Sequence, residues 1–257
     1  MRSAKSGIVL AALVMVIAFA AITVFSVTML VIQSVSRADA AHKRMKCYYA
    51  ARAGLADTAY LCSKQGGWQG GVLLPGKTYI EEDKIFFLPQ QQQADSLLVD
   101  TRFVSVEKSR AKRNSIGGIM LYNAVTSVPV KIVRLDLSWP NGGRLRKIVI
   151  GGKRVWSGRQ GSPASCSLRP VLLRPSVTPI DSLQFDADMR RVELNAVFLF
   201  SDGSKAQRTL YPASDKVLLN LRVEGGIEGS PVSCLLSAEY DFISGSLSAA
   251  QEVTDAL

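Results

Sequence analysis

An uninterrupted run of uncharged, mostly apolar residues from Ile8 to Ile32 constrains this chain more than any other feature. As a helix rising about 1.5 Å per residue, the run is about 37 Å long, which exceeds the roughly 30 Å hydrocarbon core of a bilayer. Lipid offers no partner for backbone N–H and C=O groups, so such a segment is stable there only as a helix. The run is longer than the apolar part of a cleaved secretory signal, about 7–15 residues. We therefore expect a transmembrane helix over residues 8–33.

The charges around this run favour one orientation. Arg2 and Lys5 precede it with no acidic residue nearby, which favours a cytoplasmic N-terminus. Basic residues such as Arg37 and Lys43 also follow the run, so the charge bias itself is small. We expect a single pass through the inner (cytoplasmic) membrane, with the rest of the chain forming an extracytoplasmic head in the periplasm.

The helical pattern continues beyond the apolar run. No proline occurs from Met1 to Leu74, so the helix is expected to extend to Cys62, about 55 residues or roughly 80 Å in all. Apolar residues recur at intervals of three, four or seven and predict one stripe, formed by Val35, Ala38, Met45, Tyr49, Ala56 and Tyr60. The residues expected to anchor the helix to its own head are Met45, Tyr48, Tyr49 and Leu55.

Beyond the Gly66–Gly71 cluster the hydrophobic period changes to two, which is typical of strands. The candidate strands are Lys84–Leu88, Leu97–Val106, Gly118–Val125, Val128–Leu137, Arg144–Ile150, Val192–Phe200, Arg208–Tyr211, Val217–Val223 and Val232–Tyr240. Their short spacing favours an antiparallel sheet or sandwich over βαβ units. The expected fold class is α+β, with a long N-terminal transmembrane and amphipathic helix packed on antiparallel sheet and further sandwich-like β structure.

Turn signals organise the β-rich part. Trp139–Gly143 is expected to join its flanking strands as a hairpin, and Asp202-Gly203 to form another. The Gly/Ser/Pro-rich segment Ser157–Pro163 predicts a linker or long loop. The expected organisation is a leader at 1–7, a transmembrane helix at 8–33, its amphipathic extension at 34–62, β-rich regions at 63–160 and 161–243, and a polar tail at 244–257. Whether the two β-rich regions form one domain or two is left open.

The four cysteines lie on the side of the membrane where disulfides persist. Cys47 and Cys62 fall on the expected helix, which separates them by roughly 22 Å, whereas a disulfide needs Cα atoms within about 7 Å. Cys166 and Cys234 both lie in β-type sequence and are the preferred candidate pair. Four reduced, buried thiols are the alternative.

Two segments near the N-terminus carry a family resemblance. Met1–Gly7 is short and basic and leads directly into the apolar run, as in prepilin-type leader peptides. Cys47–Leu55, which reads CYYAARAGL, resembles the Tyr-Tyr-Ala-Ala-Glu-Ala-Gly-Leu signature of minor pilins of the PilX-like kind. Over the segment up to Cys62 the chain thus resembles the type IV pilin-like and pseudopilin family, and nothing in the β-rich remainder adds to this resemblance.

The resemblance implies a structural function. It implies cleavage after Gly7 by a prepilin peptidase, N-methylation of Ile8, and helix packing in which alanines such as Ala12 allow close approach. The implied partners are other pilin or pseudopilin subunits, the prepilin peptidase and inner-membrane lipid. We expect a non-enzymatic minor subunit of a type IV pilus or type II secretion assembly.

Three residues depart from the family pattern. Ile8 stands where Phe is usual, and Arg52 replaces the glutamate of the signature. Ala12 stands where most members carry Glu, a residue thought to meet the neighbouring subunit's N-terminus. Some minor, tip-located subunits also lack that Glu, so its absence argues against a major pilin more than against the family.

Little in the sequence points to catalysis. The single histidine, His42, falls on the expected helix, so no histidine-based triad or histidine-rich metal site is expected. Gly71–Thr78 fits the G-x-x-x-x-G-K-[ST] pattern of a phosphate-binding loop. A Gly-rich segment precedes it and a candidate strand follows it, which favours a simple Pro-Gly turn. We expect no enzymatic activity, no cofactor and no metal site.

The densest basic run is the candidate patch for an anionic ligand, with Lys108, Arg110, Lys112 and Arg113. No aromatic residues interleave with these charges for base stacking, so a solvated hairpin tip is favoured over contact with nucleic acid. The formal net charge of +10 is compatible with both. The alternative function is an uncleaved, membrane-anchored extracytoplasmic protein that binds an anionic ligand or a partner protein.

Overall fold

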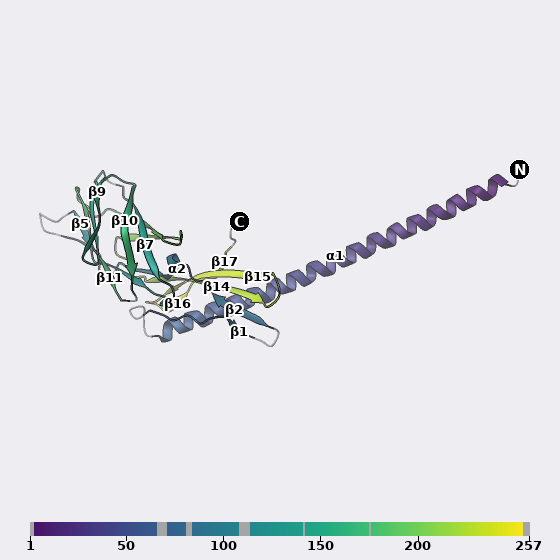
Figure 1. Ribbon diagram of the computed structural model, residues 1–257, viewed down its shortest axis with the longest axis horizontal. Coiled ribbons are helices and arrows are strands. Elements are labelled where there is room, and N and C mark those ends of the chain that lie inside the picture. Colours follow the sequence, from purple (N-terminus) through teal and green to yellow (C-terminus); the bar gives the residue numbers. More distant parts are fainter. Residues whose placement is uncertain are drawn as a thin grey trace. The chain divides into compact units, whose positions relative to one another are not determined.

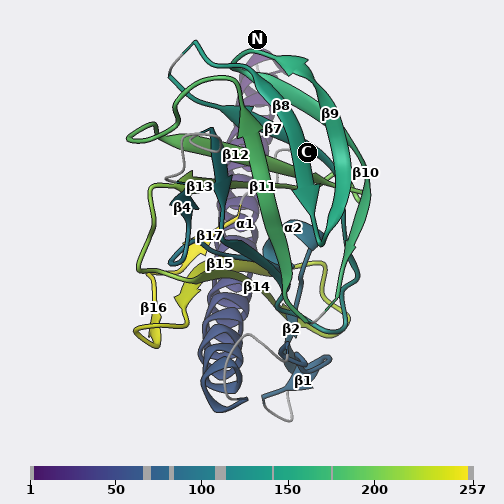
Figure 2. The same ribbon diagram turned by 90° about the vertical axis from the view of Figure 1, so that its left-hand side faces the viewer.

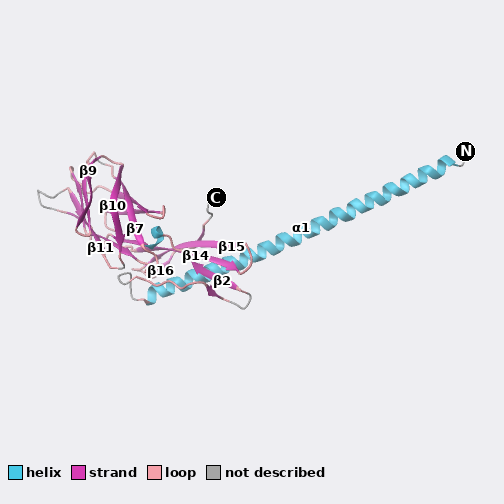
Figure 3. Ribbon diagram, viewed as in Figure 1, coloured by secondary structure: helices cyan, strands magenta, loops and turns pink. Residues whose placement is uncertain are grey.

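The computed structural model describes residues 3–65, 71–80, 84–107, 114–140, 142–174 and 176–253, with side chains from residue 13 onward. Helix α1 spans Ser3–Lys64, and the chain divides into two compact units, Met1–Lys46 and Cys47–Leu257, which are described one at a time. Apart from α1 and one short helix, the regular structure is strand (Figure 3). The predicted α+β class is confirmed.

Helix α1 is long because the sequence contains little that would break it. Proline is absent from this part of the chain, and Gly54 is the only glycine between Gly7 and Gly66. The helix ends at Lys64, whose positive charge complements the partial negative charge of the carbonyl end of a helix. The predicted continuous helix is confirmed, and it begins earlier than expected, at Ser3.

An antiparallel sheet of six strands lies beside residues 47–64 of α1 in the larger unit. Its two long strands, β14 (Leu218–Ile227) and β15 (Ser233–Asp241), run next to the helix (Figures 1 and 2). Four short strands complete it: β1 (Thr78–Tyr79), β2 (Ile85–Pro89), β16 (Ser246–Leu247) and β17 (Gln251–Glu252). Burial alternates along β14 and β15, because one face of the sheet covers the helix.

A β-sandwich forms the rest of the larger unit. One layer has the order β10 (Ala164–Leu173), β7 (Val130–Ser138), β12 (Leu194–Phe200) and β13 (Lys205–Tyr211). The other layer contains β3 (Leu97–Asp100), β4 (Ser105–Val106), β5 (Ser115–Gly117), β6 (Ile119–Asn123), β8 (Leu145–Ile150), β9 (Lys153–Gln160) and β11 (Thr178–Phe185). Side chains from both layers form one hydrophobic cluster that includes Phe185 and Phe198.

Strands β3 and β6 connect the sandwich to the sheet beside α1. Leu97 and Leu121 belong to the sandwich cluster, whereas their neighbours Leu98 and Tyr122 point into the cluster around α1. This division follows from the alternation of side chains along a strand. The larger unit therefore has two hydrophobic clusters that share two strands.

The strands of the two predicted β-rich regions are interleaved in space. In the sheet beside α1, β14 pairs with β2, and in the sandwich β10 and β12 both pair with β7. The boundary predicted between residues 160 and 161 therefore does not separate two units. The predicted linker Ser157–Pro163 is also wrong, because β9 continues to Gln160 and only 161–163 connect it to β10.

The hairpin predicted at Trp139–Gly143 does not form. The strand before it, β7, pairs with β10 and β12, whereas the strand after it, β8, pairs with β9 and β11 in the other layer. The segment instead crosses between layers, and Trp139 is buried with its Nε1–H donating to the Gly143 carbonyl at 3.0 Å. Burial of the indole ring outweighs the local turn signal.

Three other predictions have definite outcomes. The Asp202-Gly203 hairpin is confirmed: β12 and β13 pair antiparallel, and Gly203 has a φ of +84°, which suits glycine. The segment predicted as a polar tail contributes β16 and β17, both of which pair with β15. Gly71–Thr78 leads into strand β1 and not into a helix, in agreement with the predicted turn.

Asp241, at the end of β15, is expected to stabilise the fold in a pH-dependent way. Burial raises the pKa of its carboxyl, but hydrogen bonds from the Ile243 N–H, the Ser244 hydroxyl and the Val217 N–H outweigh burial and leave that pKa lowered. A lowered pKa means that the stabilisation is present above the unfolded value of about 3.9 and is lost as the pH falls through the folded value. Asp241→Asn should therefore cost about 1–2 kcal/mol at pH 7.

The measurement is guanidinium unfolding of the full chain in detergent at pH 7 and at a series of pH values below 4. The cost of Asp241→Asn should shrink over the acidic part of the series, since the native carboxylate becomes protonated there. Asp215→Asn, at an exposed position nearby, is the control and should have little effect at any pH. A cost for Asp241→Asn that does not change with pH would contradict the argument.

Candidate functional site

The smaller unit presents apolar side chains in all directions around α1. Its described large hydrophobic residues, from Leu13 to Ile32, are exposed around the helix. By length and composition this helix can cross a membrane. Residues 13–32 of this unit thus have the apolar surface that a lipid environment favours. This segment is compatible with a single-pass membrane anchor.

The hydroxyl groups within the apolar segment are satisfied by the helix itself. Thr23 Oγ1 donates to the Phe19 carbonyl at 2.7 Å, and Ser26 Oγ donates to the Ile22 carbonyl at 2.8 Å. Thr28 makes the same contact with the carbonyl four residues before it. Such bonds let hydroxyl side chains enter lipid without an unsatisfied donor. Gly7, Ile8 and Ala12 lie in the same helix.

The larger unit begins with the part of α1 that packs on the sheet. The residues that face the sheet are small: Cys47, Ala50, Ala51, Gly54 and Thr58 are all buried, together with Leu55. An alanine Cβ at Gly225 of β14 would lie 2.0 Å from the Cys47 carbonyl oxygen, and one at Gly54 would lie 2.7 Å from Val223. Cys47 Sγ also donates to the Val232 carbonyl at 3.3 Å. Helix and sheet are thus in direct backbone contact.

Two of the four predicted anchor residues are wrong. Leu55 is buried as expected, and Tyr48 is partly buried against the same cluster. Met45 and Tyr49 are 55% and 59% exposed, and Tyr49 contacts only the edge of the Tyr48 ring among the described aromatic contacts. The large residues of the predicted stripe are exposed, because the close approach of helix and sheet leaves room only for small side chains on the buried face. The three- and four-residue spacing of Cys47, Ala50, Ala51, Gly54, Leu55, Thr58 and Cys62 is the signal that could have located this face.

The predicted Cys166–Cys234 disulfide is not present. Cys166 is a buried thiol in the sandwich cluster, whereas Cys234 belongs to the cluster around α1. Burial raises the pKa of the Cys166 thiol to about 12, and burial raises that of Cys62 to about 12 as well. Thiols with such pKa values remain protonated at neutral pH and react slowly. The alternative of reduced, buried thiols fits Cys62 and Cys166.

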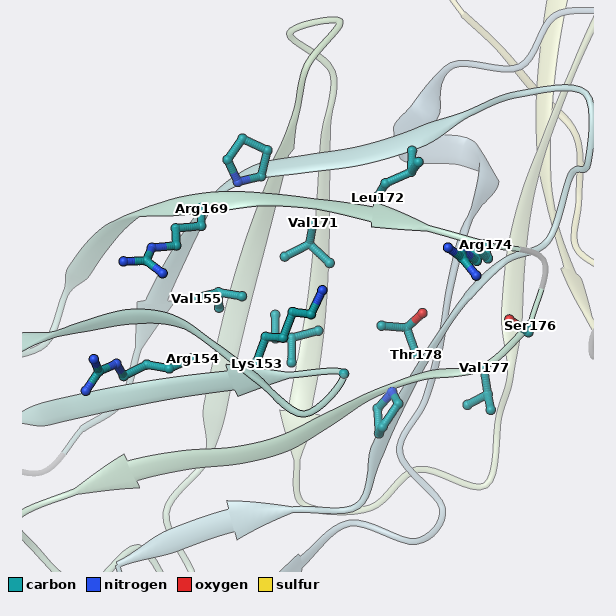
Figure 4. A pocket seen from close by; sticks show the side chains of 14 residues that line it. Lys153, Arg154, Val155, Arg169, Val171, Leu172, Arg174, Ser176, Val177 and Thr178 are labelled. Carbon is teal, nitrogen blue, oxygen red and sulfur yellow. The ribbon is translucent and has the colours of Figure 1, made fainter.

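The predicted anionic-ligand patch, Lys108, Arg110, Lys112 and Arg113, lies outside the described residues. A second basic surface, which the sequence did not reveal, lies between β9 and β10. This basic trough is an open depression of about 760 Å³ whose lining includes Lys153, Arg154, Arg169 and Arg174. Figure 4 shows Arg154 and Arg169 on different strands toward one end, Lys153 near the middle and Arg174 toward the other end. These residues lie between 153 and 174 in the sequence, on two consecutive strands of different layers and just after the second, so the strand arrangement places them along one depression.

The described residues hold no group of three or more His, Cys, Asp or Glu side chains that could bind a metal ion. His42 is exposed on α1, in the smaller unit. Comparisons with protein-family models, with curated proteins and with solved structures each gave no match.

Proposed function

We propose that this chain is a non-enzymatic structural subunit, a minor pilin or pseudopilin of a type IV pilus or type II secretion assembly. The observation that carries the proposal is the division of one helix into two kinds of surface. Residues 13–32 are apolar on every side, with internally bonded hydroxyls, and residues 47–62 pack on an antiparallel sheet through small side chains. A subunit that is stored in a membrane and assembled through its helix needs both surfaces.

The proposed route to assembly follows from the N-terminal residues. The chain is inserted in the inner membrane with its N-terminus in the cytoplasm and its head outside, and it is cleaved after Gly7 and methylated at Ile8. The apolar half of α1 then packs against the helices of other subunits, where Ala12 and neighbouring alanines allow close approach. Ala12 in place of the usual Glu supports a minor, tip-located position over that of a major subunit.

The N-terminal sequence and intact mass of the protein test this proposal. The full chain is expressed together with an active prepilin peptidase or with a catalytically inactive one. We expect loss of Met1–Gly7 and one added methyl group on Ile8 with the active enzyme alone. Gly7→Val should block the cleavage, since the implied cleavage follows a glycine, and it leaves the rest of the chain unchanged.

An intact N-terminus in the presence of an active peptidase would contradict the proposal. The result would favour the alternative, an uncleaved anchored protein that acts through its head. Incorporation into a pilus or pseudopilus is assayed by copurification with the other subunits. Cleavage without incorporation would support membership of the family but contradict the structural role.

A further inference from the structure

The basic trough lies where two sheet edges face each other. Among the described strands, β9 pairs only with β8, and β10 pairs only with β7, so each forms the edge of its layer. Charged side chains are common on edge strands because they prevent further strand pairing. Lysine is the usual residue in that role, whereas three of the four cations in the trough are arginines and its lining contains no Asp or Glu. Edge protection alone therefore does not account for this composition.

The four cations of the trough, Lys153, Arg154, Arg169 and Arg174, take part in no ion pair within 4.0 Å among the described residues. The carboxylate of Asp181, close to Lys153 in the structure, instead accepts a hydrogen bond from the Gly152 N–H at 2.7 Å. Other cations of the sandwich behave differently: Arg146 lies 3.3 Å from Asp186, for example. A concave surface lined by cations concentrates the field and attracts anions.

The shape and lining of the trough indicate the kind of anion. A neighbouring depression shares Arg154, Val155, Arg169 and Pro170 with it, so the basic surface continues along the strands and fits an extended chain. Three of the four cations are arginines, whose planar forks bind oxyanions through two parallel hydrogen bonds. The trough lining has hydroxyls at Ser176 and Thr178 and an exposed Leu172, but no aromatic ring on which bases could stack. The one aromatic residue that lines the neighbouring depression is the half-buried Trp156.

We propose that the basic trough binds an acidic polysaccharide. Oxyanion groups along the polymer pair with the four cations, the sugar hydroxyls meet Ser176 and Thr178, and the C–H faces of the sugars lie on Leu172 and the neighbouring prolines. The absence of a stacking ring from this lining disfavours single-stranded nucleic acid. This site is independent of the helix, so it does not rest on the proposed assembly function.

Fluorescence anisotropy of the full chain in neutral detergent tests the proposal. The probe is a labelled heparin-derived octasaccharide, and an uncharged maltooligosaccharide and a dT oligonucleotide of similar length are compared with it. We expect binding of the octasaccharide that weakens with added salt, at least tenfold weaker binding of the oligonucleotide, and no binding of the uncharged sugar.

Two double variants with equal charge separate the trough from overall charge. Arg154→Glu/Arg169→Glu and Lys205→Glu/Lys216→Glu each change the formal net charge by −4, from +10 to +6. The first should lower affinity at least tenfold and reduce the slope of log affinity against log salt by about two, since it removes two phosphate- or sulfate-type contacts. The second, at exposed positions outside the trough, should change affinity less than threefold.

A single variant of the trough and two contrary results complete the test of polysaccharide binding. Arg174 lies just beyond the end of β10, so its substitution should not disturb the sheet. Arg174→Ala should lower the affinity for the octasaccharide about threefold or more. Equal losses in the two double variants would overturn the proposal, since binding would then follow net charge. Tighter binding of the oligonucleotide than of the octasaccharide would also overturn it and would indicate a nucleic-acid site.

Discussion

Gly225→Ala is expected to destabilise the larger unit by about 3 kcal/mol, as overpacking against a rigid neighbour does. The new Cβ would lie 2.0 Å from the Cys47 carbonyl oxygen and 2.5 Å from the Ala51 nitrogen. Both atoms belong to the backbone of α1, so no change of rotamer relieves the clash, and the helix must move away from β14. That movement also separates Leu55 from the cluster it fills. The measurement is guanidinium unfolding of the full chain in detergent, followed by far-UV circular dichroism.

A matched glycine provides the control. An alanine Cβ at Gly161 would meet no atom within 4 Å, and Gly161 does not need a left-handed φ. Gly161→Ala should therefore change the free energy of unfolding by less than about 0.5 kcal/mol. If Gly225→Ala and Gly161→Ala had the same free energy of unfolding, the close contact between α1 and β14 would be contradicted.

Phe185→Ala is expected to cost about 3–5 kcal/mol, because it leaves a cavity that the packed sandwich cannot close. Phe185 is fully buried at the end of β11 and meets the Trp139 ring edge-on, with 5.1 Å between ring centroids. Loss of the phenyl ring also removes this aromatic contact. Phe103→Ala is the control, since Phe103 is 67% exposed, and its effect should be small. A loss below 1 kcal/mol for Phe185→Ala would contradict the described core.

The same variant tests whether the two hydrophobic clusters unfold together. Because β3 and β6 supply side chains to both, a cavity at Phe185 should lower the stability of the sheet beside α1 as well. Tryptophan fluorescence, to which Trp139 in the sandwich contributes, and helix circular dichroism should then report the same transition midpoint. Two separate transitions would mean that the clusters are independent.

Local signals predicted the elements of this fold better than their pairing. The helix followed from the absence of proline and from one long apolar run, and most strands followed from their alternating residues. The partners of those strands did not follow, because the sheets join segments far apart in the chain, as β2 and β14 are. The hairpin predicted at Trp139 does not form, because β7 and β8 pair with other strands in different layers. Trp139, between them, is buried in the sandwich.

The functional surfaces show the same division between local and long-range information. The apolar half of α1 was predictable, since it depends on composition alone. The buried face of residues 47–62 was assigned to the wrong side chains, because its glycine and alanine residues matter through Gly225, which lies far along the chain. The basic trough was not predicted, since Ser157–Pro163 was expected to be a linker and the strands β9 and β10 that carry three of its cations were not expected.

The position of β14 and β15 in the chain has a consequence for biosynthesis. These strands, residues 218–241, cover the buried face of α1 at residues 47–62. A polypeptide that emerges with its N-terminus first therefore lacks these two covering strands until most of the chain has been translated. Contacts of such long sequence separation form late and slowly. In nascent chains shorter than about 240 residues, the buried face of α1 thus lacks part of its covering sheet. Exposed apolar surface of this kind is bound by chaperones and is prone to aggregation.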